Sequence, residues 1–162
     1  MVVGGILRRL SEFDRRIVEM MPKEPPAPSE FIGMVLSGWV LFPACGLVAL
    51  LYDRGLGLRM LAALAASMAV SEGLKILVGR PRPERAGRKP WGYSFPSTHT
   101  ARVASLVPIV HHEGFFKATV FLSALTVAVA VARVVSRAHY PTDVIGGFIV
   151  GTLTGYAVVW LW

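Results

Sequence analysis

The chain has 162 residues, which suits one domain, and 54% of them are hydrophobic, with a mean hydropathy of +0.55. This composition is too apolar for an ordinary soluble domain and predicts a membrane protein. The formal net charge of +7 is compatible with nucleic acid, anionic lipid or a phosphate-bearing substrate, so the positions of the charges must decide among them. Because Cys45 is the only cysteine in the sequence, the chain can form neither an internal disulfide nor a metal site of several thiolates. Asn and Gln are absent, and this depletion of heat-labile residues predicts a thermophilic source.

The N-terminal segment 2–21 has the pattern of an amphipathic helix. Its apolar side chains recur at helical spacing, at Val3, Ile6, Leu7, Leu10, Phe13, Ile17 and Met21. Its charged side chains occupy the other face, at Arg8, Arg9, Glu12, Arg15, Arg16 and Glu19. We expect this helix to lie on the membrane surface with its arginines near lipid headgroups, and the alternative is a helix packed on another subunit. Prolines then interrupt the chain, which predicts a helix-and-linker unit at 1–30 and a transmembrane domain at 31–162.

Five apolar segments follow the linker. The clearest, 31–52, has 22 residues without a charge and can cross about 30 Å of hydrocarbon at about 1.5 Å per residue. The others are 58–78, 98–111, 115–135 and 142–162, and the short 98–111 segment is expected to be shielded by its neighbours. The predicted fold is all-α: an integral membrane helical bundle of about five transmembrane helices plus the N-terminal amphipathic interfacial helix.

The last segment has a glycine every fourth residue, at Gly147, Gly151 and Gly155. Such a smooth face lets another helix approach closely, and we expect it to support a homo-oligomer. With five crossings, the loops 79–96 and 136–141 open on the same side as the N-terminus. Because most remaining basic residues lie there, the positive-inside rule predicts a multi-pass protein of the cell membrane with this face in the cytoplasm.

Three separated segments bring polar side chains to that face. They contribute Lys75, Arg82, Ser97, Thr98, His99, Arg133, His139 and Asp143. A single Lys or Arg at a helix end is usually an anchor whose charge reaches the headgroups, and a single His in an apolar protein is more often structural. The set as a whole is interpreted differently. Polar groups at membrane depth are costly, so several of them at one face indicate a function.

Together these residues predict a phosphate site that needs no metal. Fixed cations that can neutralise a phosphate dianion are Lys75, Arg82 and Arg133. Ser97 precedes a helix, so its hydroxyl and the backbone N–H groups of Thr98 and His99 can bind an anion together. No cluster has the spacing of a zinc site and no GxxxxGK[ST] motif occurs, so we expect neither a metal nor a cofactor.

The same pattern supplies a nucleophile and an acid. His139 and Asp143 are four residues apart, which lets the carboxylate accept from one ring nitrogen and leaves the other nitrogen to attack. His99 can then protonate the leaving oxygen. Nearby charges have simpler interpretations: Glu72 pairs with Lys75, and Arg102 reaches the site or pairs with Glu72. Outer contacts to phosphate or headgroups are the hypotheses for Arg80 and Arg137, and an interfacial position is the hypothesis for His111 and His112.

These three segments resemble the motifs of the type 2 phosphatidic acid phosphatase (PAP2) superfamily, K-x6-R-P, P-S-G-H and S-R-x5-H-x3-D. The resemblance covers about residues 58–150, and two positions depart from the motifs: Thr98 stands in place of Gly and Ala132 in place of Ser. It implies that phosphate is bound by Lys75, Arg82, Ser97 and Arg133. It also implies that His99 is the acid, His139 the nucleophile that forms a phosphohistidine, and Asp143 the group that orients it.

The predicted function is hydrolysis of a lipid phosphomonoester or diphosphate at a membrane, without a nucleic-acid partner. Candidate substrates are prenyl (di)phosphates, phosphatidic acid, phosphatidylglycerol phosphate and prenyl-linked sugar phosphates. Alternatives are a non-catalytic lipid- or phosphate-binding membrane protein and a transporter, although the paired repeats of a transporter are not evident. A vanadate-dependent haloperoxidase has a similar anion pocket but is soluble, which the apolar segments disfavour.

Overall fold

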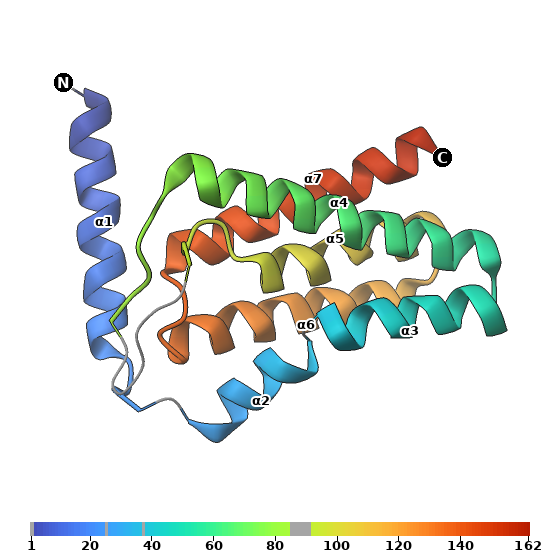
Figure 1. Cartoon of the computed structure of the whole chain (residues 1–162), viewed down its shortest axis with the longest axis horizontal. Helices are drawn as coiled ribbons and strands as arrows, with labels where there is room; N and C mark the ends of the chain where they lie inside the picture. The colour runs from blue at the N-terminus through green and yellow to red at the C-terminus, as the bar shows by residue number, and fades with distance from the viewer. Residues whose placement is uncertain (1, 25, 37, 85–91) are drawn as a thin grey trace.

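The computed structural model describes residues 2–24, 26–36, 38–84 and 92–162, and the regular elements within these ranges are all helices. They are α1 (Val2–Met20), α2 (Ala27–Val35), α3 (Gly38–Leu51), α4 (Arg54–Val78), α5 (Thr98–His112), α6 (Phe116–Val135) and α7 (Pro141–Leu161). Helices α3 to α7 run along the long axis of the molecule, and α1 stands across one end of them (Figure 1). The predicted all-α bundle is confirmed.

Three helices are long and apolar enough to cross a membrane: α4, α6 and α7. Helices α2 and α3 meet the same test only as a pair that is bent by 48°. The uncharged segment 31–52, expected as one continuous span, is therefore divided. Helix α5 has 15 residues, or about 22 Å, and is shorter than a crossing on its own. By length and composition, the described residues thus hold three helices that can cross a membrane, or four with the bent pair, and the count of about five crossings stays a prediction.

Two glycines flank the bend between α2 and α3. A Cβ atom added at Gly33 would collide with the guanidinium of Arg133, and one added at Gly38 would collide with that of Arg102. Both arginines belong to helices that are distant in the sequence, α6 and α5. Because glycine has no side chain, these two positions leave room for the two arginines. The sequence near the bend does not indicate this contact.

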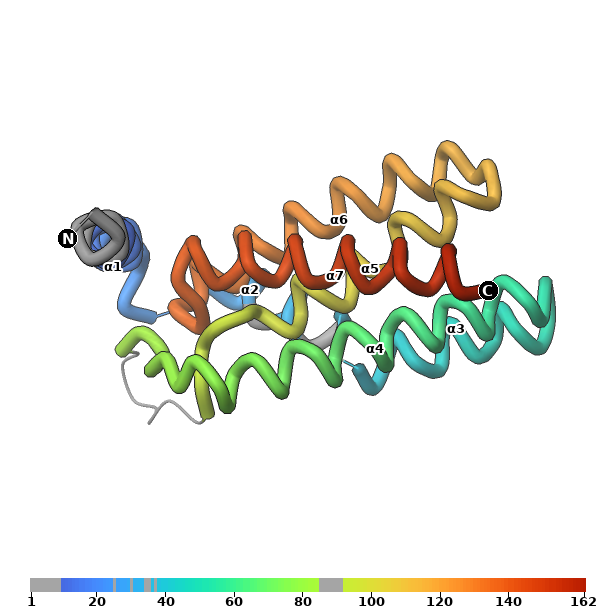
Figure 2. The backbone as a smooth tube through the Cα atoms, turned by 90° about the horizontal axis from the view of Figure 1, so that it is seen from above, coloured from blue at the N-terminus to red at the C-terminus, as the bar shows by residue number. Residues whose placement is uncertain are grey.

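Helix α5 is the inner helix of the bundle. It packs on α4, α6 and α7, and nearly all its side chains from Thr98 to Val110 are buried. Figure 2 shows it crossing behind α7, from the side of α4 to the side of α6. The expectation that this short segment is shielded by its neighbours is confirmed.

The glycines of α7 pack on α5 in the same chain. A Cβ atom at Gly147, Gly151 or Gly155 would collide with a backbone carbonyl oxygen of α5, and all three glycines are buried. This contact brings the two helix backbones close together. It also corrects the prediction that the glycine face joins two copies, because that face is already occupied.

The outer faces of the bundle are apolar. Large side chains that point away from the core include Leu50, Ile76, Leu77, Phe121 and Leu153, each more than 60% exposed. Such a surface is costly in water and suits hydrocarbon. The apolar outer surface, the spans and the inner helix describe a membrane protein.

Candidate phosphate site

The three polar segments of the sequence meet at the end of the bundle that α1 crosses (Figure 1). The first comprises the C-terminal end of α4 and the extended stretch after it, the second is the N-terminal end of α5, and the third is the turn between α6 and α7. Main-chain bonding joins two of them, because the N–H of Ser97 donates to the carbonyl of Asp143 over 2.9 Å.

A left-handed glycine ends α4 and redirects the chain across the site. Gly79 has φ 62° and donates its N–H to the carbonyl of Lys75, a helix ending for which glycine is favoured. The extended chain that follows carries Arg80 and Arg82 over the end of the bundle, where both reach the α6–α7 segment. The residues between Lys75 and Arg82 thus form the last turn of α4, the glycine that ends the helix, and an extended stretch.

Lys75 lies in a cluster with Glu72 and Thr98. Its Nζ donates to Glu72 Oε1 over 2.6 Å and to Thr98 Oγ1 over 2.5 Å, and the Thr98 hydroxyl donates to Glu72 Oε1 over 2.8 Å. The predicted pairing of Glu72 with Lys75 is confirmed. Thr98, which departs from the glycine of the motif, contributes a hydroxyl to this cluster. Lys75 is 9% exposed, so its charge is held at a fixed place beside the N-terminus of α5.

His139 is almost fully buried and held from both sides of its ring. Nδ1 lies 2.8 Å from the carbonyl oxygen of Ser94 and therefore donates to it, which leaves Nε2 unprotonated and able to accept a hydrogen bond. Nε2 lies 3.3 Å from Nη1 of Arg82, which also donates to the carbonyl of Ala138. This orientation turns Nε2 toward the cationic side of the candidate site.

Asp143 does not hold the ring as the sequence spacing predicts. Its Oδ2 lies 3.6 Å from Nδ1 of His139, beyond a hydrogen bond, and accepts instead from the N–H of Tyr140 over 2.8 Å. The carboxylate therefore caps the start of α7 and acts on the ring through its charge. The closer acceptor, the carbonyl of Ser94, escapes prediction because a main-chain oxygen has no sequence signature.

A second carboxylate, Asp14 of α1, is bonded to the Asp143 region and was missed by the sequence analysis. Arg80 joins the two, with Nη1 2.7 Å from Asp143 Oδ1 and Nη2 2.6 Å from Asp14 Oδ2. Asp14 also accepts from the N–H of Thr142 over 3.0 Å, and it is 1% exposed. The signal in the sequence is that Asp14 shares a helical face with Val18, which lies one turn further on and is also buried.

Both outer arginines contact other parts of the protein, and their hypothesised contacts to phosphate or headgroups stay a prediction. Arg80 binds the two carboxylates, and its guanidinium lies 4.2 Å from the centre of the Tyr140 ring. Arg137 donates to the carbonyls of Met21 and Glu19 at the C-terminal end of α1. Both side chains fasten α1 to the site.

The two remaining predicted phosphate contacts are Ser97, at the N-cap of α5, and Arg133, in the last turn of α6. Ser97 is fully buried, its hydroxyl accepts from Thr100 Oγ1 over 3.1 Å, and it makes no side-chain cap to α5. The helix N-terminus is therefore free of a side-chain cap and can bind an anion. Arg133, in the last turn of α6, acts electrostatically on both His99 and His139.

The buried position of His139 determines its charge. Burial lowers its pKa from 6.5 to about 4, and the positive charges of Arg133 and Arg82 act in the same direction, whereas Asp143 opposes them. The imidazole is therefore neutral at physiological pH, as a nucleophile must be.

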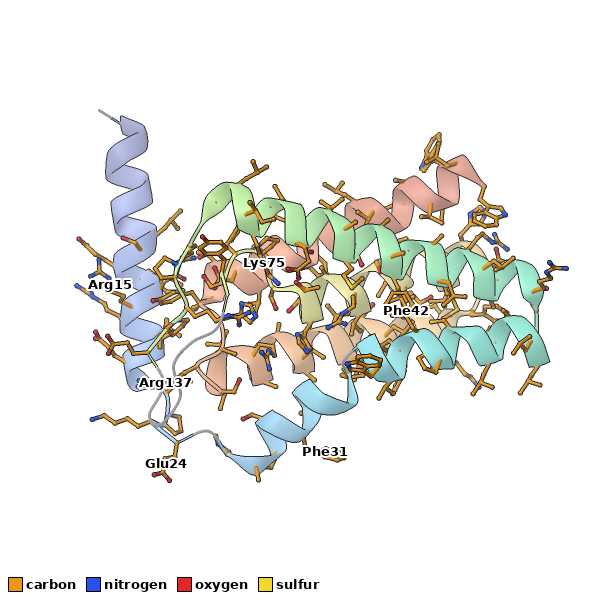
Figure 3. All side chains as sticks on the ribbon, viewed as in Figure 1. Arg15, Glu24, Phe31, Phe42, Lys75 and Arg137 are labelled. Carbon is orange, nitrogen blue, oxygen red and sulfur yellow. The ribbon has the colours of Figure 1, made fainter. Side chains whose placement is uncertain are left out.

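His99 faces a cavity of about 700 Å³ between α3, α4 and α5. The cavity is lined by Gly38, Trp39, Phe42, Pro43, Met68, His99 and Arg102. Its wall is thus apolar apart from two basic side chains on one face of α5. In Figure 3, Lys75 and other side chains with nitrogen atoms point into the bundle near its α1 end. Over the described ranges, no three His, Cys, Asp or Glu side chains lie close enough together to hold a metal ion.

Known proteins share both the sequence pattern and the fold. A family model described as the PAP2 superfamily matches residues 56–162. Phosphatidylglycerophosphatase B of Bacillus subtilis strain 168 is 33% identical over 113 residues, which are 63% of this chain and 56% of that protein. The chain thus spans only about half the length of this curated relative.

Two solved structures have the same arrangement of helices. The crystal structure of Aquifex aeolicus LpxE matches with a TM-score of 0.74 over 91% of this chain and 93% of that chain. A transmembrane PAP2-type phosphatidylglycerolphosphate phosphatase from Bacillus subtilis matches with a TM-score of 0.72 over 97% and 86%. Each is 22% identical in sequence, so these matches establish the fold.

Proposed function

Because the chain belongs to the PAP2 superfamily, we propose that it is a membrane enzyme that hydrolyses a phosphomonoester or diphosphate of a lipid through a phosphohistidine on His139. One observation carries the proposal: a buried neutral imidazole is held by a main-chain carbonyl with its other nitrogen turned to Arg82. A purely structural histidine needs no such cationic partner. The arrangement supports a nucleophile that attacks the phosphorus atom of an anionic phosphate group.

The first step transfers the phosphoryl group to the enzyme. Nε2 of His139 attacks phosphorus, the bond from phosphorus to the leaving oxygen breaks, and His99, which carries a proton while the phosphate dianion is bound beside it, gives that proton to the leaving oxygen. Nδ1–H stays on the Ser94 carbonyl, and the nearby charge of Asp143 balances the positive ring. Negative charge on the equatorial oxygens is stabilised by Lys75, Arg82, Arg133, Ser97 and the N–H groups of Thr98 and His99.

The second step returns the enzyme to its starting state. His99, now neutral, takes a proton from a water molecule, and the water oxygen attacks phosphorus as the phosphorus–Nε2 bond breaks. Inorganic phosphate leaves and the imidazole is again neutral. No step of this sequence calls on a metal or a cofactor.

The proposed site for the lipid tail is the apolar cavity next to His99. The apolar cavity between α3, α4 and α5 begins at His99, so a leaving alcohol protonated there extends into it. Candidate substrates remain prenyl (di)phosphates, phosphatidic acid, phosphatidylglycerol phosphate and prenyl-linked sugar phosphates. Two relatives are named for phosphatidylglycerol phosphate, which makes it the first substrate to test.

The proposal includes an interfacial role for α1, with residues 1–30 as one unit and 31–162 as the transmembrane unit. Helix α1 lies across the bundle rather than along it (Figure 2). Its apolar side chains at Leu10, Phe13 and Met20 are 45%, 51% and 68% exposed, which suits insertion among headgroups. The active face is proposed to lie in the cytoplasm of a cell membrane.

The test is phosphate release by purified protein in mixed micelles with a panel of these lipids. His139→Ala should lower the rate on the order of 10³-fold or more, because it removes the attacking nitrogen. His111→Ala, which changes a histidine at the far end of α5, should act like wild type. Equal rates for His139→Ala and wild type would exclude the proposed mechanism. An excess of chelator should leave the wild-type rate unchanged, and loss of activity with chelator would exclude a metal-free reaction.

A further inference from the structure

Arg102 is a buried cation for which the mechanism gives no role. It is 7% exposed and lies on α5 one turn after His99. Among the described residues its guanidinium has no hydrogen bond or ion pair, and its Nε is buried without a partner. Its electrostatic neighbours include Glu72, Lys75 and His99. A buried charge without a bonded partner is costly, which indicates that something else supplies the partner.

The surroundings of Arg102 are shaped to receive a ligand. The side chain lines the 700 Å³ cavity together with Trp39, Phe42 and Met68. Gly38 lies against the guanidinium, and a Cβ atom there would collide with Nη1. The start of α3 is therefore built around this arginine, and the rest of the wall is apolar apart from His99. A guanidinium in such a cavity has the geometry to bind a phosphate with two parallel hydrogen bonds.

The place of Arg102 along α5 determines which part of a substrate it meets. In the proposed mechanism His99 protonates the leaving oxygen, so the leaving group lies on the His99 side of the phosphorus. Arg102 is three residues further, about 4.5 Å along the helix axis. It therefore faces the atoms of the leaving group rather than the phosphoryl group that is transferred.

We propose that Arg102 binds a second anionic group, a phosphate or phosphodiester, carried by the leaving part of the substrate. This inference rests on the proposed function. A lipid diphosphate leaves as a lipid monophosphate, and phosphatidylglycerol phosphate leaves as phosphatidylglycerol, so both carry such a group. Phosphatidic acid leaves as an uncharged diacylglycerol and offers Arg102 nothing. The site therefore selects lipids that bear a second phosphate.

The test compares kcat/KM for phosphatidylglycerol phosphate, a prenyl diphosphate and phosphatidic acid in mixed micelles. Arg102→Leu should lose about 10- to 100-fold more activity on one or both doubly phosphorylated lipids than on phosphatidic acid, the range for a hydrogen-bonded charge. Arg102→Lys should lose less, because it keeps a charge. Arg54→Leu, an exposed arginine at the far end of the bundle, should match wild type. Equal loss on all three lipids, or no loss, would overturn the inference.

A binding measurement separates this inference from the proposed mechanism. His139→Ala protein should bind a doubly phosphorylated lipid more tightly than phosphatidic acid, and adding Arg102→Leu should remove that preference. If wild type releases no phosphate from any lipid but the preference exists and depends on Arg102, the proposed function fails and the anion site stands. If wild type is active but no preference depends on Arg102, the anion site fails alone. A thermal melt of each variant checks folding, and Arg102→Gln, which also lacks the charge, replaces Arg102→Leu if the latter does not fold.

Discussion

The proposed role of His139 as the nucleophile depends on atoms outside its own helical turn. The carbonyl of Ser94 fixes the tautomer, Arg82 lies beside Nε2, and Arg133 adds a further positive charge. Burial and these charges favour the neutral ring. The depressed pKa also links folding to pH: the unfolded chain binds the proton first. Stability from this residue is complete above pH 6.5 and is lost as pH falls toward 4.

The protonation state of His139 can be measured directly. Protein labelled with ¹⁵N in its four histidines should give one ring that stays neutral at pH 5.5 and titrates near pH 4, because its pKa is about 4. The signal should vanish in His139→Ala, which assigns it. A midpoint above 6 for this ring would contradict the burial and the cationic surroundings described above.

Side chains of the site could be predicted where spacing carries the information. Lys75, Arg82, His99 and His139 are titratable groups at motif spacing, and the structure brings them to one end of the bundle. The carbonyl of Ser94 could not be predicted, because any residue supplies a carbonyl and only the loop geometry places it. The expected Asp143–His139 hydrogen bond follows from helical spacing, but the two residues lie across the start of α7, where the carboxylate caps the backbone instead.

Helix α1 is attached to the candidate site by charged side chains. Asp14 and Arg80 connect it to Asp143, and Arg137 holds the last carbonyls of the helix. The amphipathic helix could be predicted from its periodicity, but its attachment could not, since the partners lie more than 60 residues away. The bend between α2 and α3 was missed for the same reason: the arginines that fill it come from α5 and α6.

The attachment of α1 predicts a catalytic effect of Asp14. Asp14→Asn should lower kcat several-fold with little change in KM, because Arg80 loses one of its two carboxylates and holds Asp143 less firmly. Asp53→Asn is the matched control, since Asp53 caps α4 at the other end through the N–H of Leu56. Both variants should lower the melting temperature, and only Asp14→Asn should lower kcat and shift the ring signal of His139. Equal kcat in the two variants would mean that α1 has a structural role alone.

The whole molecule has a polar end with α1 and the site, and an opposite end with the α3–α4 and α5–α6 turns (Figure 1). The side of the membrane that each end faces was inferred from the distribution of basic residues. A charge count alone is ambiguous here, because several of the counted arginines bind groups of the site or of α1.

Labelling of introduced cysteines can decide the orientation. In a Cys45→Ala background, Glu84→Cys should react with a membrane-impermeant maleimide only after the cells are permeabilised, because its loop is proposed to face the cytoplasm. Lys117→Cys, exposed at the opposite end, should react on intact cells. The reverse pattern would place the active site outside the cell.

The glycine contact between α5 and α7 has a consequence for how such a protein can diversify. With backbones this close, the spacing between the start of α5 and the start of α7, and so between Ser97 and Asp143, has almost no freedom. The opposite wall of the cavity comes from α3 and α4, through Trp39, Phe42 and Met68. Under the proposed function, evolution can exchange these three side chains, and thereby the lipid tails that fit the cavity, without altering the distance between Ser97 and Asp143.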